Sequence, residues 1–134
     1  MKTFLDSGVL LAGWRRTPIT DAAMSVIADD TREFYTAQLV KLETLPKAQY
    51  EKNRCEQDFY ETHFAQAMHC EPLSEALGNQ AADLAARYGL AGPDALQIAA
   101  AIRQGVSEFI TSEKPGRPVF RVKEIRVISL YSLA

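Results

Sequence analysis

The chain opens with a short apolar run that leads into an apolar-rich helical stretch. Residues 2–5 form the run, which ends at Asp6, and Ser7-Gly8 then opens the stretch from Val9 to Trp14. This pattern predicts a strand that feeds a helix, with Asp6 at the carboxyl end of the strand.

The next segments repeat that alternation of strand and helix. Thr17-Pro18 interrupts the first helix, and Thr20 is expected to cap the second. The β-prone triplet 34–36 then precedes helical spacing from Leu39 to Glu43, which is expected to last until Pro46. The second helix presents one face formed by Ala23, Val26, Ile27 and Asp30.

The middle of the chain has a long segment without Gly or Pro. Residues 48–68 hold many good helix formers and predict one long helix. Ser74 is expected to cap the following helix, which Gly89 ends in the left-handed conformation. One stripe of the long helix runs through Cys55, Phe59, His63 and Ala67, and the following helix has an apolar face of Leu77, Ala81, Leu84, Ala85 and Tyr88.

One more helix and three short strands complete the predicted elements. Pro93 stands in the first turn of the helix and Gly105 ends it, while strands are expected at residues 108–111, 119–122 and 126–130. Helices interleaved with single short strands predict an α/β fold whose mostly parallel sheet is covered on both faces. Ligands bind at the carboxyl ends of the strands in such sheets.

The composition is that of an ordinary soluble globular protein, and 134 residues predict a single domain over residues 1–134. A hydrophobic content of 47% with 24% charged residues excludes the disordered, fibrous and disulfide-stapled classes. Neither a signal peptide nor a membrane span is predicted, so we expect a cytoplasmic protein with no membrane partner. Cys55, Cys70, His63 and His69 lack the spacing of a zinc clamp, and we expect them to be buried or half-buried.

The candidate chemistry rests on acidic residues. The chain lacks the glycine-rich signatures of dinucleotide and P-loop sites and the G-x-S-x-G elbow of serine hydrolases. Asp6 ends the first strand, Glu43 follows Leu39 and Val40 on an apolar helical side, Asp94 lies in a first helical turn, and Glu113 follows the strand at 108–111.

Three of these acids also have a simpler interpretation: helix capping for Asp6, a favourable helix dipole for Asp94 and a solvated loop for Glu113. The parallel sheet is nevertheless expected to bring all four acids to one edge. Ionised carboxylates about 4 Å apart repel by roughly 4 kcal/mol at an effective dielectric constant of 20. A hard divalent cation removes that repulsion, so Mg²⁺ or Mn²⁺ and metal-assisted hydrolysis of a phosphodiester are predicted.

Four segments closely resemble the PIN domain family, in order and across nearly the whole chain: Asp6–Leu11, Tyr35–Glu43, Asp94–Ala101 and Thr111–Lys114. The resemblance implies a three-layer α/β/α sandwich with a mostly parallel central sheet of four or five strands. It also implies a Mg²⁺- or Mn²⁺-dependent ribonuclease built from Asp6, Glu43, Asp94 and Glu113. Small bacterial members are typically toxins of VapBC-type toxin–antitoxin pairs, which implies a cognate antitoxin and a homodimer.

On this resemblance Asp6 and Asp94 hold the principal metal ion, Glu113 ligates it directly or through water, and Glu43 completes the site or orients the attacking water. Thr111, Gln97 and Lys114 are weaker candidates for contacts to a site acid or to the substrate. The family often has His at Gln97, Asp at Glu113 and Ser at Ala37. Lys114, Arg117, Arg121, Lys123 and Arg126 are either a solvated face or contacts to RNA phosphates.

Other functions stay open at this point. They are a housekeeping RNA-processing nuclease and a catalytically weak PIN-like module that binds RNA or protein. A phosphatase built on Asp6 is disfavoured because Gly8 stands where a D-x-D motif needs its second Asp. The net charge of -2 opposes nucleic-acid binding, but without the four candidate acids the 17 acids become 13 against 15 bases, which leaves +2.

Overall fold

The computed structural model describes all 134 residues, and five parallel strands form its central sheet. The chain first adds strands on one side of β1 and then on the other, so the strand order reverses between β1 and β4. Such a reversal opens a crevice at the carboxyl ends of the two strands. In the spatial order β3-β2-β1-β4-β5, the strands are β1 (Lys2–Leu5), β2 (Glu33–Ala37), β3 (Cys70–Glu71), β4 (Glu108–Thr111) and β5 (Arg126–Ser129).

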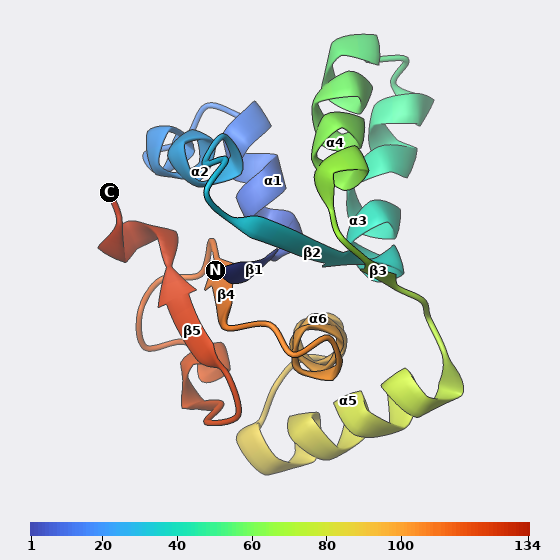
Figure 1. Cartoon of the computed structure of the whole chain (residues 1–134), viewed down its shortest axis with the longest axis vertical. Coiled ribbons are helices and arrows are strands. Elements are labelled where there is room, and N and C mark those ends of the chain that lie inside the picture. Colours follow the sequence, from blue (N-terminus) through green and yellow to red (C-terminus); the bar gives the residue numbers. More distant parts are fainter.

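Six α-helices cover the two faces of the sheet, which confirms the predicted three-layer α/β/α fold (Figure 1). One face carries α1 (Ser7–Trp14), α2 (Thr20–Ile27), α3 (Gln38–Tyr50) and α4 (Arg54–Gln66). On the other face α6 (Gly92–Arg103) lies against the sheet and α5 (Glu75–Tyr88) packs on α6. The 3-10 helices η1 (Pro118–Arg121) and η2 (Leu130–Ser132) flank β5.

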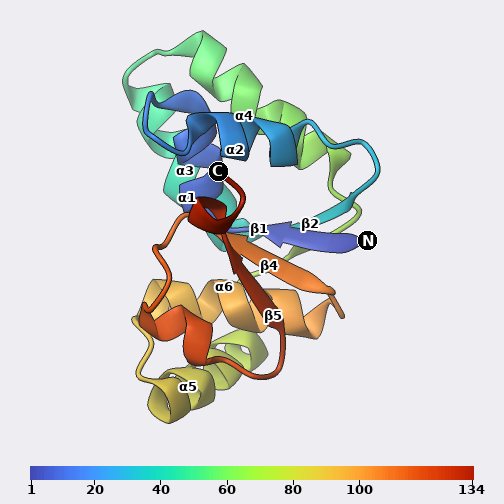
Figure 2. The ribbon, with the colours of Figure 1, turned by 90° about the vertical axis from the view of Figure 1, so that its left-hand side faces the viewer.

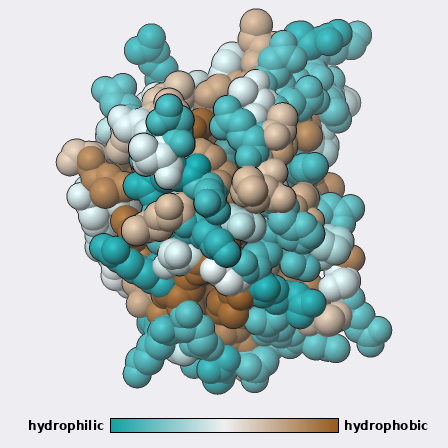
Figure 3. All heavy atoms as spheres, in the orientation of Figure 1, coloured by the Kyte–Doolittle hydropathy of each residue, from teal (hydrophilic) through white to brown (hydrophobic).

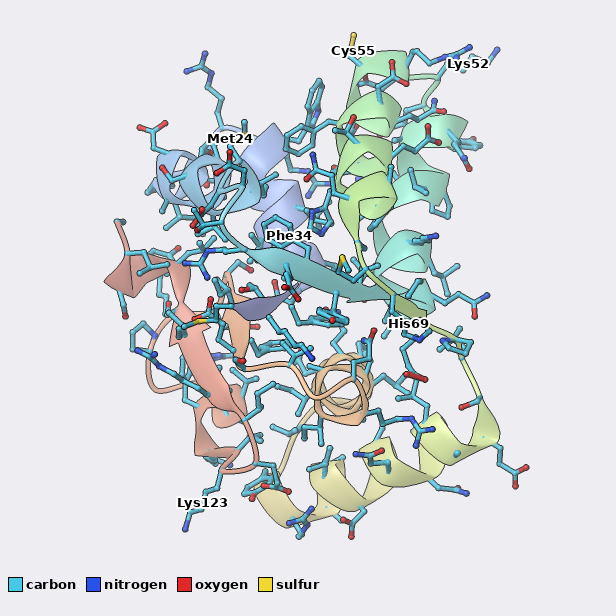
Figure 4. All side chains as sticks on the ribbon, viewed as in Figure 1. Met24, Phe34, Lys52, Cys55, His69 and Lys123 are labelled. Atoms are coloured by element: carbon cyan, nitrogen blue, oxygen red, sulfur yellow. The ribbon has the colours of Figure 1, made fainter.

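The core lies on both sides of the central strands. Phe4 on β1 and Phe109 on β4 stack with ring centroids 5.4 Å apart. Residues 99–101 of α6 are three fully buried alanines, and their small side chains let α6 approach the sheet closely. Phe34 on β2 lies in the other layer, near α1 and α4 (Figure 4), where its ring centroid is 5.1 Å from that of His63.

The predicted single helix over residues 48–68 is in fact two helices. α3 ends at Tyr50 and α4 begins at Arg54, and Lys52 between them has a positive φ of 55° (Figure 4). The Asn53 side chain accepts a hydrogen bond from the amide of Glu56 and so caps α4. An asparagine cap can begin a new helix although no Gly or Pro interrupts residues 48–68. The buried residues of α4 are Glu56, Tyr60 and His63. The expected burial is therefore correct for His63 and for the half-buried Cys70, but wrong for Cys55 and His69, which are exposed.

Two predicted helix boundaries are also wrong. α3 passes through Pro46, since Pro46 and Leu42 both face solvent, where water can hydrate the Leu42 carbonyl that loses its N–H donor. Thr20 is the first residue of α2 rather than its cap, and its hydroxyl donates to the Arg15 carbonyl at 2.7 Å. Because α2 ends at Ile27, Asp30 lies outside its apolar face.

The strand predicted at residues 119–122 is wrong, because this segment forms the 3-10 helix η1. Pro118 at its start has a fixed φ and no N–H to donate to a ladder. Val119 and Val122 are buried, so the apolar pattern reflects the burial of a turn. The fifth strand is instead β3, two residues beside β2 that are too few to show any periodicity.

The surface is largely polar on the side seen in Figure 3. Hydrophilic side chains cover most of this face, and hydrophobic atoms gather in its lower half, between β5 and α6. None of the helices combines the length and the apolar character that a membrane span requires.

Candidate active site

Asp6 lies where β1 ends and α1 begins. Its carboxylate accepts a hydrogen bond from the Val9 amide at 2.9 Å, so the capping interpretation is correct. The residue is also only 9% exposed, which a simple helix cap does not require. Burial raises the pKa of Asp6 to about 7, although hydrogen bonds from the Thr111 hydroxyl and from the amides of Val9 and Ser112 oppose the shift.

Asp94 is half-buried in the first turn of α6, and it interacts electrostatically with the other three predicted acids. Its pKa is raised first by burial and then by the negative charges of Glu113 and Glu43, while Arg117 lowers it. The charge of Asp94 in turn raises the pKa of Asp6. The structure therefore brings the four predicted acids into one electrostatic neighbourhood, although they come from four separate segments of the chain.

Glu113 follows β4 in a loop that is tied down on both sides. Its amide donates to the Thr111 hydroxyl at 3.1 Å, and its carbonyl accepts from the Ser129 hydroxyl at 2.6 Å. Its carboxylate lies 3.5 Å from the Arg117 guanidinium in an exposed pair, which contributes little to stability. Asp94, Glu113 and Arg117 line a common cavity of about 200 Å³.

Glu43 is exposed on α3, yet its carboxylate is held in place. Its Oε1 accepts from Nε2 of Gln97 at 2.7 Å and from the Ser7 hydroxyl at 3.1 Å. Gln97 is 3% exposed, and its Oε1 accepts from the Ser7 amide at 3.0 Å. Ser7 is not among the predicted site residues. Its position directly after Asp6, at the start of a helix, is the sequence feature that could have indicated it.

Gly8 permits the close approach of two parts of the site. A Cβ at this position would lie 2.0 Å from the Ser112 hydroxyl and 3.1 Å from Ser112 Cβ, so any side chain here would force Ser112 to move. Glycine thus lets the loop after β4, which carries Glu113, pack against the first turn of α1. Lys114 in the same loop is exposed, and its ammonium lies 5.6 Å from the ring centroid of Tyr131.

The donor chemistry of this site suits a hard divalent cation. No group of three or more His, Cys, Asp or Glu side chains is close enough to enclose a metal ion. Mg²⁺, however, is usually held by one or two carboxylates and keeps several of its waters. Asp6 and Asp94 offer such oxygen donors, and their raised pKa values mean that burial and neighbouring acids disfavour the ionised carboxylates, which a bound cation would stabilise.

Comparisons with known proteins agree on the family and the fold. The PIN domain family model matches residues 3–114. The VapBC2 complex of Rickettsia felis, solved with a promoter DNA fragment, has a TM-score of 0.70 and 11% identity and covers 96% of this chain and 98% of that chain. FitAcB from Neisseria gonorrhoeae has a TM-score of 0.66 and 16% identity and covers 96% and 98%. VapC20 from Mycobacterium tuberculosis, described as a sarcin-ricin loop cleaving toxin, has a TM-score of 0.68 and 16% identity and covers 92% and 98%. At these identities the likeness concerns the fold, and no curated protein matches the sequence.

Proposed function

This chain belongs to the PIN domain family, and on that premise we propose that it is a divalent-metal-dependent endoribonuclease that hydrolyses RNA phosphodiester bonds. One observation carries the proposal: Asp94 lies in the fields of Glu113 and Glu43 and itself acts on the buried Asp6. These acids meet at the reversal of strand order, where α/β sheets bind ligands. Repelling carboxylates that are kept together at such a place are suited to hold a cation.

Each acid has a proposed role. Asp6 and Asp94 hold Mg²⁺ or Mn²⁺, Glu113 ligates it directly or through water, and Glu43 completes the site or orients the attacking water. When bound, the ion supplies a water of lowered pKa and neutralises charge on the phosphate. The residues around the acids fix them: the Thr111 hydroxyl donates to Asp6, while Gln97 and Ser7 both donate to Glu43.

We extend the proposal to the toxin of a type II toxin–antitoxin pair. A further solved structure with this fold is described as a toxin–antitoxin complex from Klebsiella pneumoniae, which supports a cognate antitoxin as a partner of this chain. VapC20 is described as a sarcin-ricin loop cleaving toxin, which supports RNA as the substrate. A homodimer completes the proposed assembly. Inspection of the neighbouring genes separates the toxin from a housekeeping nuclease. A short adjacent reading frame that encodes a DNA-binding antitoxin favours the toxin.

A second candidate function is a PIN-like module that binds RNA or protein without turnover. It is favoured by the pairing of Glu113 with Arg117 and by the absence of any three-acid group that encloses a metal ion. Titration calorimetry separates the two functions. Lack of Mn²⁺ binding at millimolar concentration by the folded chain favours the module, whereas binding favours the nuclease.

The direct test is cleavage of structured and single-stranded RNA by the purified chain. We expect cleavage with Mg²⁺ or Mn²⁺, no cleavage with excess chelator, and a loss of at least about 100-fold in Asp6→Asn and in Asp94→Asn, because each substitution removes a charge that holds the ion.

The matched control is Asp21→Asn. Asp21 also lies in the first turn of a helix, α2, but it is exposed and outside the site. Its substitution is expected to leave cleavage within about twofold, as surface changes usually do. Cleavage that persists in Asp6→Asn or Asp94→Asn would overturn the proposed site.

A further inference from the structure

A second pocket adjoins the acids on the side of α1. It has a volume of about 310 Å³, at the lower end of the range of small-molecule sites. We call it the Tyr131 pocket. Its lining includes Gly8 and Leu11 of α1, Arg15, Thr17 and Ile19 between α1 and α2, Ser112 after β4, and Tyr131 of η2.

The Tyr131 pocket shares a wall with the proposed active site. Gly8 and Ser112 line the pocket: a Cβ on Gly8 would lie 2.0 Å from the Ser112 hydroxyl and 3.3 Å from Asp6 Oδ1, and the Ser112 amide lowers the pKa of Asp6. A group in the pocket therefore lies beside the Asp6 carboxylate, across the wall that Gly8 and Ser112 form. The chain end that carries Tyr131 lies beside α2, as Figure 2 shows.

Tyr131 is fixed to the acidic loop although its ring is exposed. Its amide donates to the Ser129 hydroxyl at 3.1 Å, and that hydroxyl donates to the Glu113 carbonyl at 2.6 Å. The residue is 36% exposed. Lys114, the neighbour of Glu113, lies with its ammonium 5.6 Å from the ring centroid. The pocket thus combines an aromatic ring on an anchored backbone, apolar walls and the Arg15 side chain, with the Lys114 ammonium beside the ring.

From this combination we infer that the Tyr131 pocket binds one unpaired nucleobase of the RNA strand whose phosphate lies at the acids. The inference rests on the proposed function. An aromatic ring offers a stacking surface for any base, and a lysine ammonium pairs with the phosphate of a flanking nucleotide. Arg15 in the lining and Lys114 beside the ring, together with the apolar walls, complement a strand that alternates flat bases with negative phosphates.

The test measures the affinity of the full chain for a fluorescein-labelled single-stranded oligoribonucleotide of mixed sequence, by anisotropy in chelator so that the RNA stays intact. Tyr131→Ala is expected to weaken binding by about 5- to 150-fold, the range that one stacked base contributes. Tyr131→Phe keeps the ring and is expected to bind within about twofold of the wild type. The matched control is Tyr50→Ala, because Tyr50 is 89% exposed at the far end of α3.

A series of oligonucleotides with one abasic site each then identifies the base. One abasic position is expected to weaken the wild type as much as Tyr131→Ala does, and at that position the substitution adds no further loss, since both changes remove the same contact. An equal loss for the wild type and for Tyr131→Ala at every abasic position would show that the ring contacts no base and would overturn the inference.

The remaining outcomes separate this inference from the proposed function. If the wild type binds and cleaves RNA but Tyr131→Ala binds as tightly as Tyr131→Phe, the pocket does not bind a base and the nuclease stands. That result would leave a side chain of a protein partner as the occupant. If the wild type binds no RNA in chelator, the inference is overturned; if it also cleaves no RNA with Mg²⁺ or Mn²⁺, the proposed function is overturned with it. Thermal melting of each variant checks that the fold is intact.

Discussion

Gln97 joins three parts of the site through one side chain. Its amide nitrogen donates to Glu43 at 2.7 Å and to the Ser7 hydroxyl at 3.1 Å, and its oxygen accepts from the Ser7 amide. Both polar atoms are therefore used, and the side chain is buried. The glutamine holds the Glu43 carboxylate in one orientation and ties it to the helix start that follows Asp6.

At the residue scale we predict that Gln97→Ala lowers kcat at least about tenfold while the chain stays folded. The Glu43 carboxylate loses its strongest donor and its orientation, and the Ser7 amide loses its acceptor, which costs about 1–3 kcal/mol of stability. Cleavage kinetics and urea denaturation measure the two effects separately.

Gln104→Ala is the matched control for this prediction. Gln104 is the C-cap of the same helix, and its side chain donates to the Thr36 and Ala100 carbonyls at 3.0 Å rather than to a site residue. We expect a similar loss of stability with kcat unchanged. Equal kcat values in Gln97→Ala and Gln104→Ala contradict the orienting role of Gln97.

At the scale of the elements, α4 places the uncharged side chain of His63 among aromatic rings. His63 is 1% exposed, and neither ring nitrogen has a hydrogen-bond partner. Its ring lies 5.1 Å from that of Phe34 and 5.8 Å from that of Phe64, measured between centroids. Burial lowers the pKa of His63 to about 4, so the packing of α4 on β2 depends on the uncharged ring.

This burial predicts an acid-sensitive docking of α4. The unfolded chain binds a proton at His63 near pH 6.5 and the folded chain only near pH 4, so the contribution is complete above pH 6.5 and is lost as the pH falls to 4. The loss is at most about 3 kcal/mol. His63→Leu is expected to abolish this contribution, so that the difference in stability between wild type and His63→Leu changes with pH across the interval, as measured by urea denaturation at several pH values.

His69→Leu is the control for the histidine on α4. His69 is exposed, and its substitution is expected to leave the pH dependence of the wild type unchanged. Parallel stability profiles for the wild type and His63→Leu contradict the prediction.

For the whole molecule, the charge distribution matters more than the net charge of -2. Four acids from distant segments gather at one edge of the sheet, and burial raises the pKa of Asp6 to about 7. A carboxyl whose pKa is raised on folding stabilises the fold below its unfolded pKa of 3.8, and this stabilisation is lost as the pH rises through about 7. At pH 8 the ionised Asp6 therefore destabilises the metal-free fold.

We predict that Asp6→Asn stabilises the metal-free chain at pH 8 by about 1–3 kcal/mol, since Asn still caps α1 and carries no charge. Mn²⁺ is expected to raise the melting temperature of the wild type and to leave that of Asp6→Asn unchanged. Thermal melting with and without Mn²⁺ measures both effects. Asp21→Asn serves as the control, and a lower melting temperature of metal-free Asp6→Asn contradicts the prediction.

The sequence by itself determined the elements whose signals are local. The strand before Asp6, the Ser74 cap, the left-handed Gly89 and the start of α6 at Gly92-Pro93 all agree with the structure, because periodicity and capping depend on a few neighbouring residues. The sequence also indicated the four acids, since each stands at an unusual place in its own segment.

Only the tertiary structure decided what surrounds those acids. The hydrogen bonds from Gln97 to Ser7 and to Glu43 span 90 and 54 residues of the chain. The hydrogen bond from Ser129 to Glu113 spans 16 residues, and Ser129 also accepts from the Tyr131 amide. The two-residue β3 likewise exists only because β2 offers it an edge to pair with. Such contacts depend on where the crossovers of the sheet bring distant segments together, and no local pattern of side chains encodes that meeting.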